Sequence, residues 1–192
     1  MDHDERFNKL IEDLYISAKS YETLLDKKII FECKEFVKQK NYEARFYEDN
    51  YLHLTGIKTK LNAKEFFKEC LTKTISITDI LNFPKEYHSK ISGKLKNIQN
   101  IGLFFNQKLE MQESFIRNTI ICAVASSDGF KTLGFVLAGK LLLPMTILNR
   151  NKLDPTKDIF NVKPRIIEIK KSPRWTYSVP RTGCEIYIKS IN

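Results

Sequence analysis

The chain has 192 residues, 42% of them hydrophobic, and a formal net charge of +9 at neutral pH. This length allows one complete hydrophobic core, and the aromatic share of 11% argues against an intrinsically disordered chain. No apolar run is long enough to cross a bilayer, and the acidic start is unlike a secretory signal. We therefore expect a soluble, cytoplasmic protein with no membrane partner.

The first part of the chain is predicted to be mainly helical. Apolar residues recur at helical spacing over residues 4–24, and two strands at 27–36 and 41–49 form an early β-hairpin. Residues 62–71 are predicted to form a helix, because an asparagine N-cap and a glutamate three residues later make a capping box. Shorter helical segments are expected at 76–81 and 87–102.

The second part of the chain is predicted to form a mainly antiparallel sheet. β-branched and aromatic runs alternate there with turn residues, in "TIICAVAS", "TLGFVLAG", "KLLLPMTIL", "PRIIEIKK" and "CEIYIKS". We find no linker or internal repeat, so we expect an α+β fold in one domain, 1–192, that is helix-rich over 1–105 and sheet-rich over 106–192.

The basic charge is concentrated after residue 50. Residues 1–50 hold 9 Lys and Arg against 12 Asp and Glu, a net charge of −3, whereas residues 51–192 hold 23 against 11, a net charge of +12. Such an excess attracts a polyanion such as RNA, because each neutralised phosphate releases a condensed counterion. The alternative is a lysine-rich chain that is basic without binding nucleic acid.

The absence of several known motifs argues against the kinds of chemistry that depend on them. The chain has no GxxxxGK[ST] phosphate loop, no HExxH, no GxSxG and no carboxylate cluster for magnesium. The histidines His3, His53 and His88 lack metal-ligand spacing, and the four cysteines form no CxxC pair. We therefore expect neither a metal ion nor another cofactor, and acid–base chemistry around a histidine is what remains.

One stretch, "YLHLTGIKTK" at residues 51–60, brings the side chains for such chemistry together. Cleavage of RNA by its own 2′-hydroxyl needs a base, an acid and cations for the charge that develops on the phosphate. His53 titrates near neutrality and can serve as acid or base. Lys58 and Lys60 supply positive charge, and Thr55 can form a hydrogen bond to a phosphate oxygen.

Residues on predicted strands are expected to complete this site. We assign Thr146 to the catalytic group and Arg45 and Lys170 to RNA binding. The alternatives are structural. His53 would then be a partly buried histidine bonded to a backbone carbonyl, and the two lysines after it would belong to a solvated turn.

A longer segment, "FYEDNYLHLTGIKTKLNAKEFFKECL", resembles the signature of the phage-associated Barnase–EndoU–colicin–RelE-like (BECR-fold) nuclease family, in a subgroup with an HLTG core followed by a short helix. "YETLLDKKIIFECK" is similar to the family's lead-in to its first strand, and "LGFVLAGKLLLPMTILNRNKLD" and "KPRIIEIKK" are similar to its later strands. The resemblance covers about residues 20–171, and the tail 174–192 has no counterpart.

The resemblance implies N-terminal helices packed on a curved antiparallel sheet. It also implies a metal-independent ribonuclease that acts as a toxin or effector of phages and mobile elements, with RNA rather than DNA as substrate and with an inhibitor or antitoxin as partner. The family's functional residues map to His53 and Thr55, and further to Lys58, Lys60 and Thr146.

Three interpretations remain open from the sequence. The first, which we favour, is a ribonuclease effector in which His53 is the acid or base. The second is an inactive relative that binds RNA, the ribosome or a partner protein through the same basic surface. The third is a structural or regulatory protein, such as an immunity or phage accessory protein, with His53 in the core.

Overall fold

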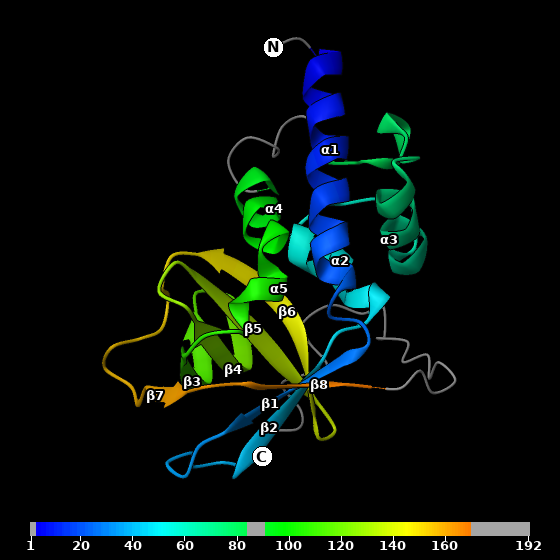
Figure 1. Cartoon of the computed structure of the whole chain (residues 1–192). Coiled ribbons are helices and arrows are strands. Elements are labelled where there is room, and N and C mark those ends of the chain that lie inside the picture. Colours follow the sequence, from blue (N-terminus) through cyan, green and yellow to red (C-terminus); the bar gives the residue numbers. More distant parts are fainter. Residues whose placement is uncertain (1–2, 84–90, 170–192) are drawn as a thin grey trace.

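The computed structural model describes residues 3–83 and 91–169, with most helices before residue 105 and most strands after it (Figure 1). In chain order the elements are α1 (His3–Glu22), β1 (Lys27–Glu32), β2 (Asn41–Arg45), α2 (Glu48–Thr55), α3 (Ala63–Thr72), the 3-10 turn η1 (Ile77–Asp79), α4 (Ser92–Gln99), α5 (Ile101–Phe104), β3 (Leu109–Arg117), β4 (Ile120–Ser127), β5 (Lys131–Ala138), β6 (Leu141–Asn149), β7 (Phe160–Val162) and β8 (Arg165–Glu168).

Eight strands form one curled sheet in the order β7-β3-β4-β5-β6-β2-β1-β8. Neighbouring strands run antiparallel except β2 and β6, which are parallel, with Ala44 opposite Leu142. The early hairpin of β1 and β2 therefore lies between β6 and β8. The expected α+β fold, with N-terminal helices on a curved antiparallel sheet, is confirmed, and the one parallel pair is a difference from that expectation.

Contacts between the two ends of the sheet maintain its curl. The carboxylate of Glu113 on β3 accepts hydrogen bonds from the backbone N–H groups of Val37 and Lys38, at 2.9 and 3.1 Å, in the loop between β1 and β2. In the same loop the ring of Phe36 meets the ring of Phe160 on β7 edge to face, with centroids 5.2 Å apart. Strands that are distant in the sheet order are thus brought together.

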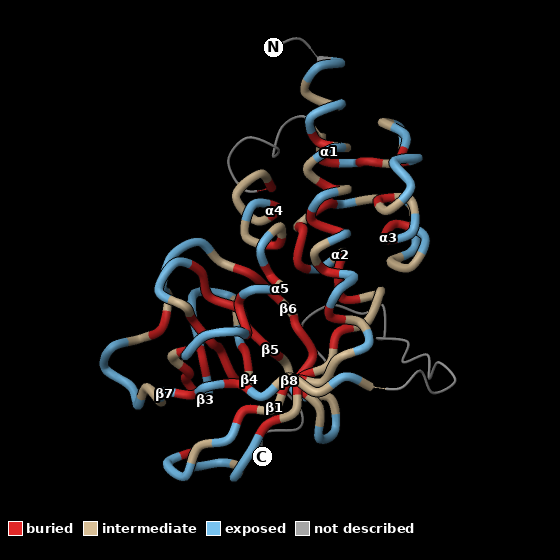
Figure 2. Tube along the Cα trace, in the orientation of Figure 1, coloured by how far each residue is buried: buried red, intermediate tan, exposed pale blue. Residues whose placement is uncertain are grey.

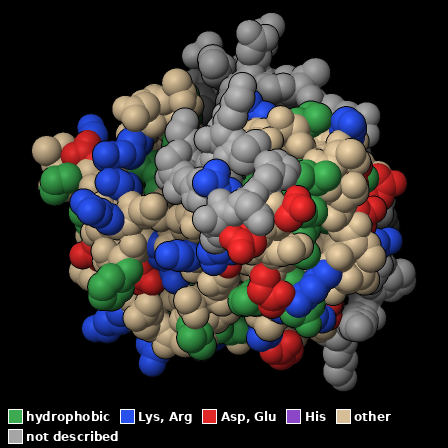
Figure 3. Space-filling view, turned by 90° about the horizontal axis from the view of Figure 1, so that it is seen from above, with side chains coloured by type: hydrophobic (Ala, Val, Ile, Leu, Met, Phe, Trp, Pro, Cys, Tyr) green, Lys and Arg blue, Asp and Glu red, His purple; other side chains and the backbone are tan. Residues whose placement is uncertain are grey.

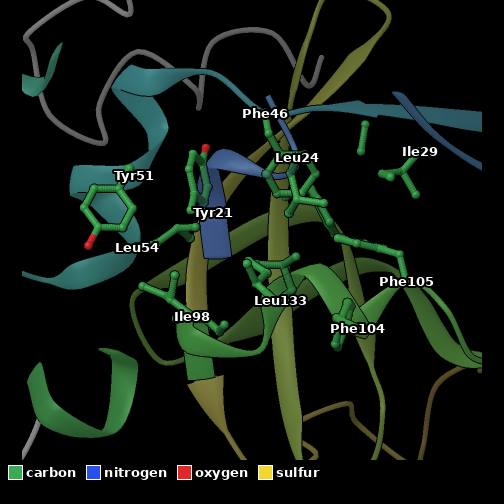
Figure 4. Packing of buried hydrophobic residues seen from close by; sticks show 14 of the residues in the cluster. Tyr21, Leu24, Ile29, Phe46, Tyr51, Leu54, Ile98, Phe104, Phe105 and Leu133 are labelled. Carbon is green, nitrogen blue, oxygen red and sulfur yellow. The ribbon is translucent and has the colours of Figure 1, made fainter. Parts of the chain in front are cut away.

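The helices pack on one face of the sheet and form the main core with it (Figure 2). α1 buries a stripe at helical spacing, with Leu10, Leu14, Ala18 and Tyr21 all fully buried. Figure 4 shows Tyr21 near Leu54 of α2 and Ile98 of α4, so that side chains of three helices meet above the strands.

A second, smaller cluster lies on the opposite face of the sheet. The outer half of the β3–β4 hairpin bends onto β5 and β6 there, after Ser114 adopts a left-handed φ of 55°. A Cβ atom on Gly134 would lie only 2.6 Å from Cys122 Sγ and 2.9 Å from Thr146 Cγ2. Glycine at this position therefore allows the close approach of β4 to the outer face of β5 and β6.

The predicted strand at 41–49 was partly wrong, because the strand ends at Arg45 and α2 begins at Glu48. Asn50 Oδ1 accepts the Tyr47 N–H at 3.2 Å and so satisfies a backbone group that precedes the new helix. Tyr51 and Leu54 bury the inner side of α2, and the Tyr51 hydroxyl donates to the Leu14 carbonyl of α1 at 2.9 Å. Tertiary packing thus converts a strand-like pattern into a helix.

β3 was not predicted, because its alternation of buried and exposed residues breaks at the left-handed Ser114. The helix at 63–72, with Asn62 as N-cap and Glu65 in the capping box, is confirmed.

The predicted strand "CEIYIKS", the tail 174–192, and the first residues of the helix predicted at 87–102 lie outside the described residues. In the described part of the chain, no helix has the length and apolar character that crossing a bilayer would require.

Candidate active site

The HLTG sequence forms the last turn of α2 and the glycine that ends it. Asp49, His53 and Gly56 are spaced i, i+4 and i+7, so they lie along one face of the helix. Tyr51 and Leu54 lie on the buried side and hold this face outward against the main core. Gly56 ends the helix with a left-handed φ of 74°, a conformation that glycine adopts without strain.

His53 is exposed to solvent, so the structure does not support the interpretation of a core histidine. Desolvation by the surrounding protein lowers the pKa of the His53 imidazole, and the negative charge of Asp49 partly raises it. The neutral ring is therefore the main form at neutral pH, and a neutral ring can accept a proton.

Asp49 is the carboxylate that accompanies His53 on this face. Its Oδ1 atom is buried and has no hydrogen-bond partner among the described residues. Burial raises the pKa of Asp49, while the charges of Lys64 and His53 lower it in part. A buried carboxylate oxygen without a hydrogen bond destabilises the fold, so packing alone does not explain its presence.

Lys94 of α4 lies against the glycine that ends α2. A Cβ atom placed on Gly56 would be 3.3 Å from Lys94 Nζ. The side chain is half-buried, and desolvation lowers the pKa of its ammonium group. Within residues 3–83 and 91–169, this ammonium forms no salt bridge or hydrogen bond. The turn thus has His53 one helical turn before it and a partly desolvated cation beside it.

Thr55 is fully buried, and its hydroxyl is used within the turn itself. It donates to the Leu52 carbonyl at 2.8 Å and accepts the Ile57 N–H at 3.1 Å. Asn82 holds the turn from the other side, because its amide donates to the Gly56 carbonyl at 3.2 Å and accepts the Lys58 N–H at 3.0 Å. These bonds make Thr55 a positioning residue for the HLTG turn.

We predict that Thr55→Val destabilises the protein by about 1–3 kcal/mol, because the Ile57 N–H loses its buried acceptor. Equilibrium unfolding in urea measures this difference. The matched control is Thr72→Val at the end of α3, where the hydroxyl is exposed, and it should change stability by less than about 0.5 kcal/mol. Equal effects of the two changes would contradict the positioning role of Thr55.

Lys58 and Lys60 are both exposed, on a short extended segment that follows the turn. The Leu81 N–H donates to the Lys58 carbonyl at 2.7 Å, and the Lys60 N–H donates to the Asp79 carbonyl at 3.0 Å. The intervening Thr59 pairs with Ile80 as an isolated bridge. This pairing fixes the backbone of the segment, so the two exposed lysines start from fixed backbone positions close to the turn.

Arg45 and Thr146 lie elsewhere. Arg45 is the last residue of β2 and lies between the core residues Ala44 and Phe46, and its Nε donates to Glu43 Oε1 at 2.6 Å. Thr146 faces Gly134 and the second cluster on the outer face, whereas α2 packs on the inner face. The structure does not bring these two side chains to His53, and Lys170 lies outside the described residues.

Figure 3 shows one face of the molecule, on which Lys and Arg side chains gather mainly toward the left edge and Asp and Glu mainly toward the lower right. The positive charge is therefore uneven over this surface.

Within the described ranges, no three His, Cys, Asp or Glu side chains gather so that they could hold a metal ion.

Sequence reasoning missed Asp49 and Lys94. The i, i+4, i+7 spacing of Asp49, His53 and Gly56 is visible in the sequence, but a predicted strand through residue 49 concealed it. No sequence signal indicates that Lys94 contacts Gly56, because that contact depends on how α4 packs against α2.

Comparison with known proteins identifies the family. No curated protein and no solved structure matches the chain. A family model described as phage-Barnase-EndoU-ColicinE5/D-RelE like nuclease4 matches residues 13–177, which is most of the chain and includes the HLTG turn and Lys94. The curled sheet with N-terminal helices is consistent with that fold. The chain therefore belongs to the phage-Barnase-EndoU-ColicinE5/D-RelE like nuclease4 family.

Proposed function

We propose that this nuclease is a metal-independent endoribonuclease that cleaves RNA through its own 2′-hydroxyl, with His53 as the proton-transfer residue. One observation carries the proposal. Three ionisable groups around the Gly56 turn, Asp49, His53 and Lys94, have pKa values displaced against their charged forms by desolvation. Such groups are gathered more often at catalytic sites than at structural ones.

In this mechanism the neutral imidazole of His53 takes the proton of the 2′-hydroxyl. The 2′-oxygen attacks the adjacent phosphorus, and the bond to the 5′-oxygen breaks. That oxygen takes a proton from solvent water, and the imidazolium of His53 returns its proton to the hydroxide. Negative charge accumulates on the non-bridging oxygens, and the partly desolvated ammonium of Lys94 stabilises it. Lys58 and Lys60 add positive charge at the rim. The products are a 2′,3′-cyclic phosphate and a 5′-hydroxyl.

A substrate comparison tests the reaction type. We expect cleavage of an RNA oligonucleotide and no cleavage of a DNA oligonucleotide of matching sequence, because DNA lacks the attacking hydroxyl. Electrophoresis of end-labelled oligonucleotides measures this. Equal cleavage of both would contradict transesterification.

We predict that Asp49→Asn slows cleavage about tenfold, because the loss of negative charge makes His53 a weaker base. The pKa of His53 should fall further, so the acidic limb of the pH–rate profile should move to lower pH. An unchanged profile would contradict a role for Asp49 through His53.

The same change should not reduce stability at neutral pH. The folded-state pKa of Asp49 is raised, so its ionisation costs stability as the pH rises above the ordinary value of 3.8. Asp49→Asn removes that cost, and melting at pH 7 should occur at an equal or higher temperature than in the wild type. At pH below 3.8 the difference should disappear.

We also propose that the chain acts as a toxin or effector of a phage or mobile element. The family's description as phage-associated nucleases supports this role. Expression in bacterial cells should arrest growth, His53→Ala should relieve the arrest, and an inhibitor protein encoded by a neighbouring gene should neutralise the wild type. Normal growth of cells that produce active enzyme would contradict this role.

A further inference from the structure

A pocket of about 410 Å³ opens on the outer face of the sheet, the face opposite to α2. Its walls come from the end of the β3–β4 hairpin, with Arg117, Asn118 and Ile120, and from the end of β6 and the loop after it, with Leu148, Arg150 and Lys152. The pocket exists because the hairpin bends onto β5 and β6, as described for the second cluster. Its volume lies in the range of ligand sites.

The pocket is cationic, and no carboxylate is among the described residues that line it. Arg117, Arg150 and Lys152 approach it from two separate segments of the chain. None of the salt bridges between described residues involves these three side chains. Three cations around one hollow repel one another, and an anion relieves that repulsion.

The backbone on one side of the pocket is held in place. The buried hydroxyl of Thr132 donates to the Arg150 carbonyl at 3.0 Å and accepts the Lys152 N–H at 2.8 Å. Arg150 itself has a left-handed φ of 66°, which is unusual for a residue other than glycine. The backbone that carries two of the cations is thus fixed before any ligand arrives.

An exposed aromatic residue lies beside this cationic wall. Phe130 is 84% exposed, and its carbonyl accepts the Arg150 N–H at 2.7 Å. Single-stranded nucleic acids are bound by such pairs, in which cations contact the phosphates and an aromatic ring stacks on an unpaired base.

We propose that this pocket binds a backbone phosphate of single-stranded RNA, away from the bond that is cut, with a neighbouring base stacked on Phe130. The inference rests on the proposed function for the identity of the substrate as RNA. The pocket is connected to the helical side through Asn149, whose Oδ1 accepts a hydrogen bond from Asn97 of α4 at 2.6 Å. In this proposal the RNA runs from the pocket, past Asn149 at the end of β6, toward α4 and the Gly56 turn.

The test measures binding in a His53→Ala background, so that the result does not depend on cleavage. A labelled single-stranded RNA is titrated at several salt concentrations with the parent and with Arg117→Gln/Arg150→Gln. The control is Lys140→Gln/Lys157→Gln, which removes the same charge at two exposed positions outside the pocket. Melting curves compare the folds, and Lys152→Gln against Lys140→Gln repeats the comparison with single changes.

We expect the pocket variant to raise the Kd at least about tenfold and to reduce the salt slope by about 0.7 for each phosphate that it no longer neutralises. Phe130→Ala should also weaken binding, but without a change in salt slope. The control should change the Kd by less than about twofold. Equal increases in Kd for pocket and control variants, or no RNA binding by the parent, would overturn the proposal. If these expectations hold while the wild type leaves RNA uncut, the pocket assignment stands and only the proposed catalysis fails.

Discussion

His53→Ala should lower the rate of RNA cleavage by about two to four decades, the usual contribution of one acid–base residue. His53 is exposed on α2, so its removal leaves no cavity in the core. The alanine variant should therefore fold and melt like the wild type. Single-turnover cleavage of a labelled RNA measures the rate, and thermal unfolding verifies the fold.

The wild-type pH profile supplies an independent control for this result. The pKa of His53 is lowered by desolvation, so the acidic limb of kcat/KM should lie below the ordinary value of 6.5. A limb that survives in the alanine variant would show that another group transfers the proton. Loss of cleavage together with loss of folding would instead indicate a structural role for His53.

Lys94→Gln should lower kcat about one-hundredfold, because it removes the partly desolvated positive charge that the proposed mechanism places beside the scissile phosphate. Stability should not fall with activity. The folded-state pKa of Lys94 is lowered, so its charged form is destabilised by folding at neutral pH, and glutamine removes that cost. Steady-state cleavage and melting at pH 7 measure the two effects.

The matched control is Lys96→Gln, two residues along α4. Lys96 is exposed, and its loss should change kcat by less than about twofold. If both lysines have the same effect, the contribution of α4 is general positive charge. If Lys94→Gln is fully active, Lys94 serves only to pack against Gly56.

The sequence predicted the elements with a complete local signal better than those without one. Asn62 and Glu65 carry a complete local signal, and the helix they begin is present as expected. β3 was missed because its signal breaks at Ser114, where the hairpin bends onto another part of the sheet. The parallel pairing of β2 with β6 depends on contacts between residues about one hundred positions apart, which local periodicity does not encode.

For the candidate site, the sequence located the HLTG turn but not all the residues that lie around it. His53 and the two exposed lysines were identified from residue types in one short segment. Thr55 was assigned to substrate, although its burial and its two hydrogen bonds within the turn make it a positioning residue. Lys94 is brought to the turn only by the packing of α4 on α2, so a search along the chain does not find it.

The most direct test of the account is the end group left by cleavage in the presence of EDTA. Purified wild type and His53→Ala are incubated with RNA in EDTA, and the 3′ ends of the fragments are identified by mass spectrometry. We predict wild-type fragments with 2′,3′-cyclic phosphate ends and almost no fragments from the alanine variant. Cleavage that requires magnesium, or that leaves a 3′-hydroxyl, would contradict the proposed mechanism. RNA that is bound but left intact by the wild type would favour an inactive, RNA-binding relative of the family.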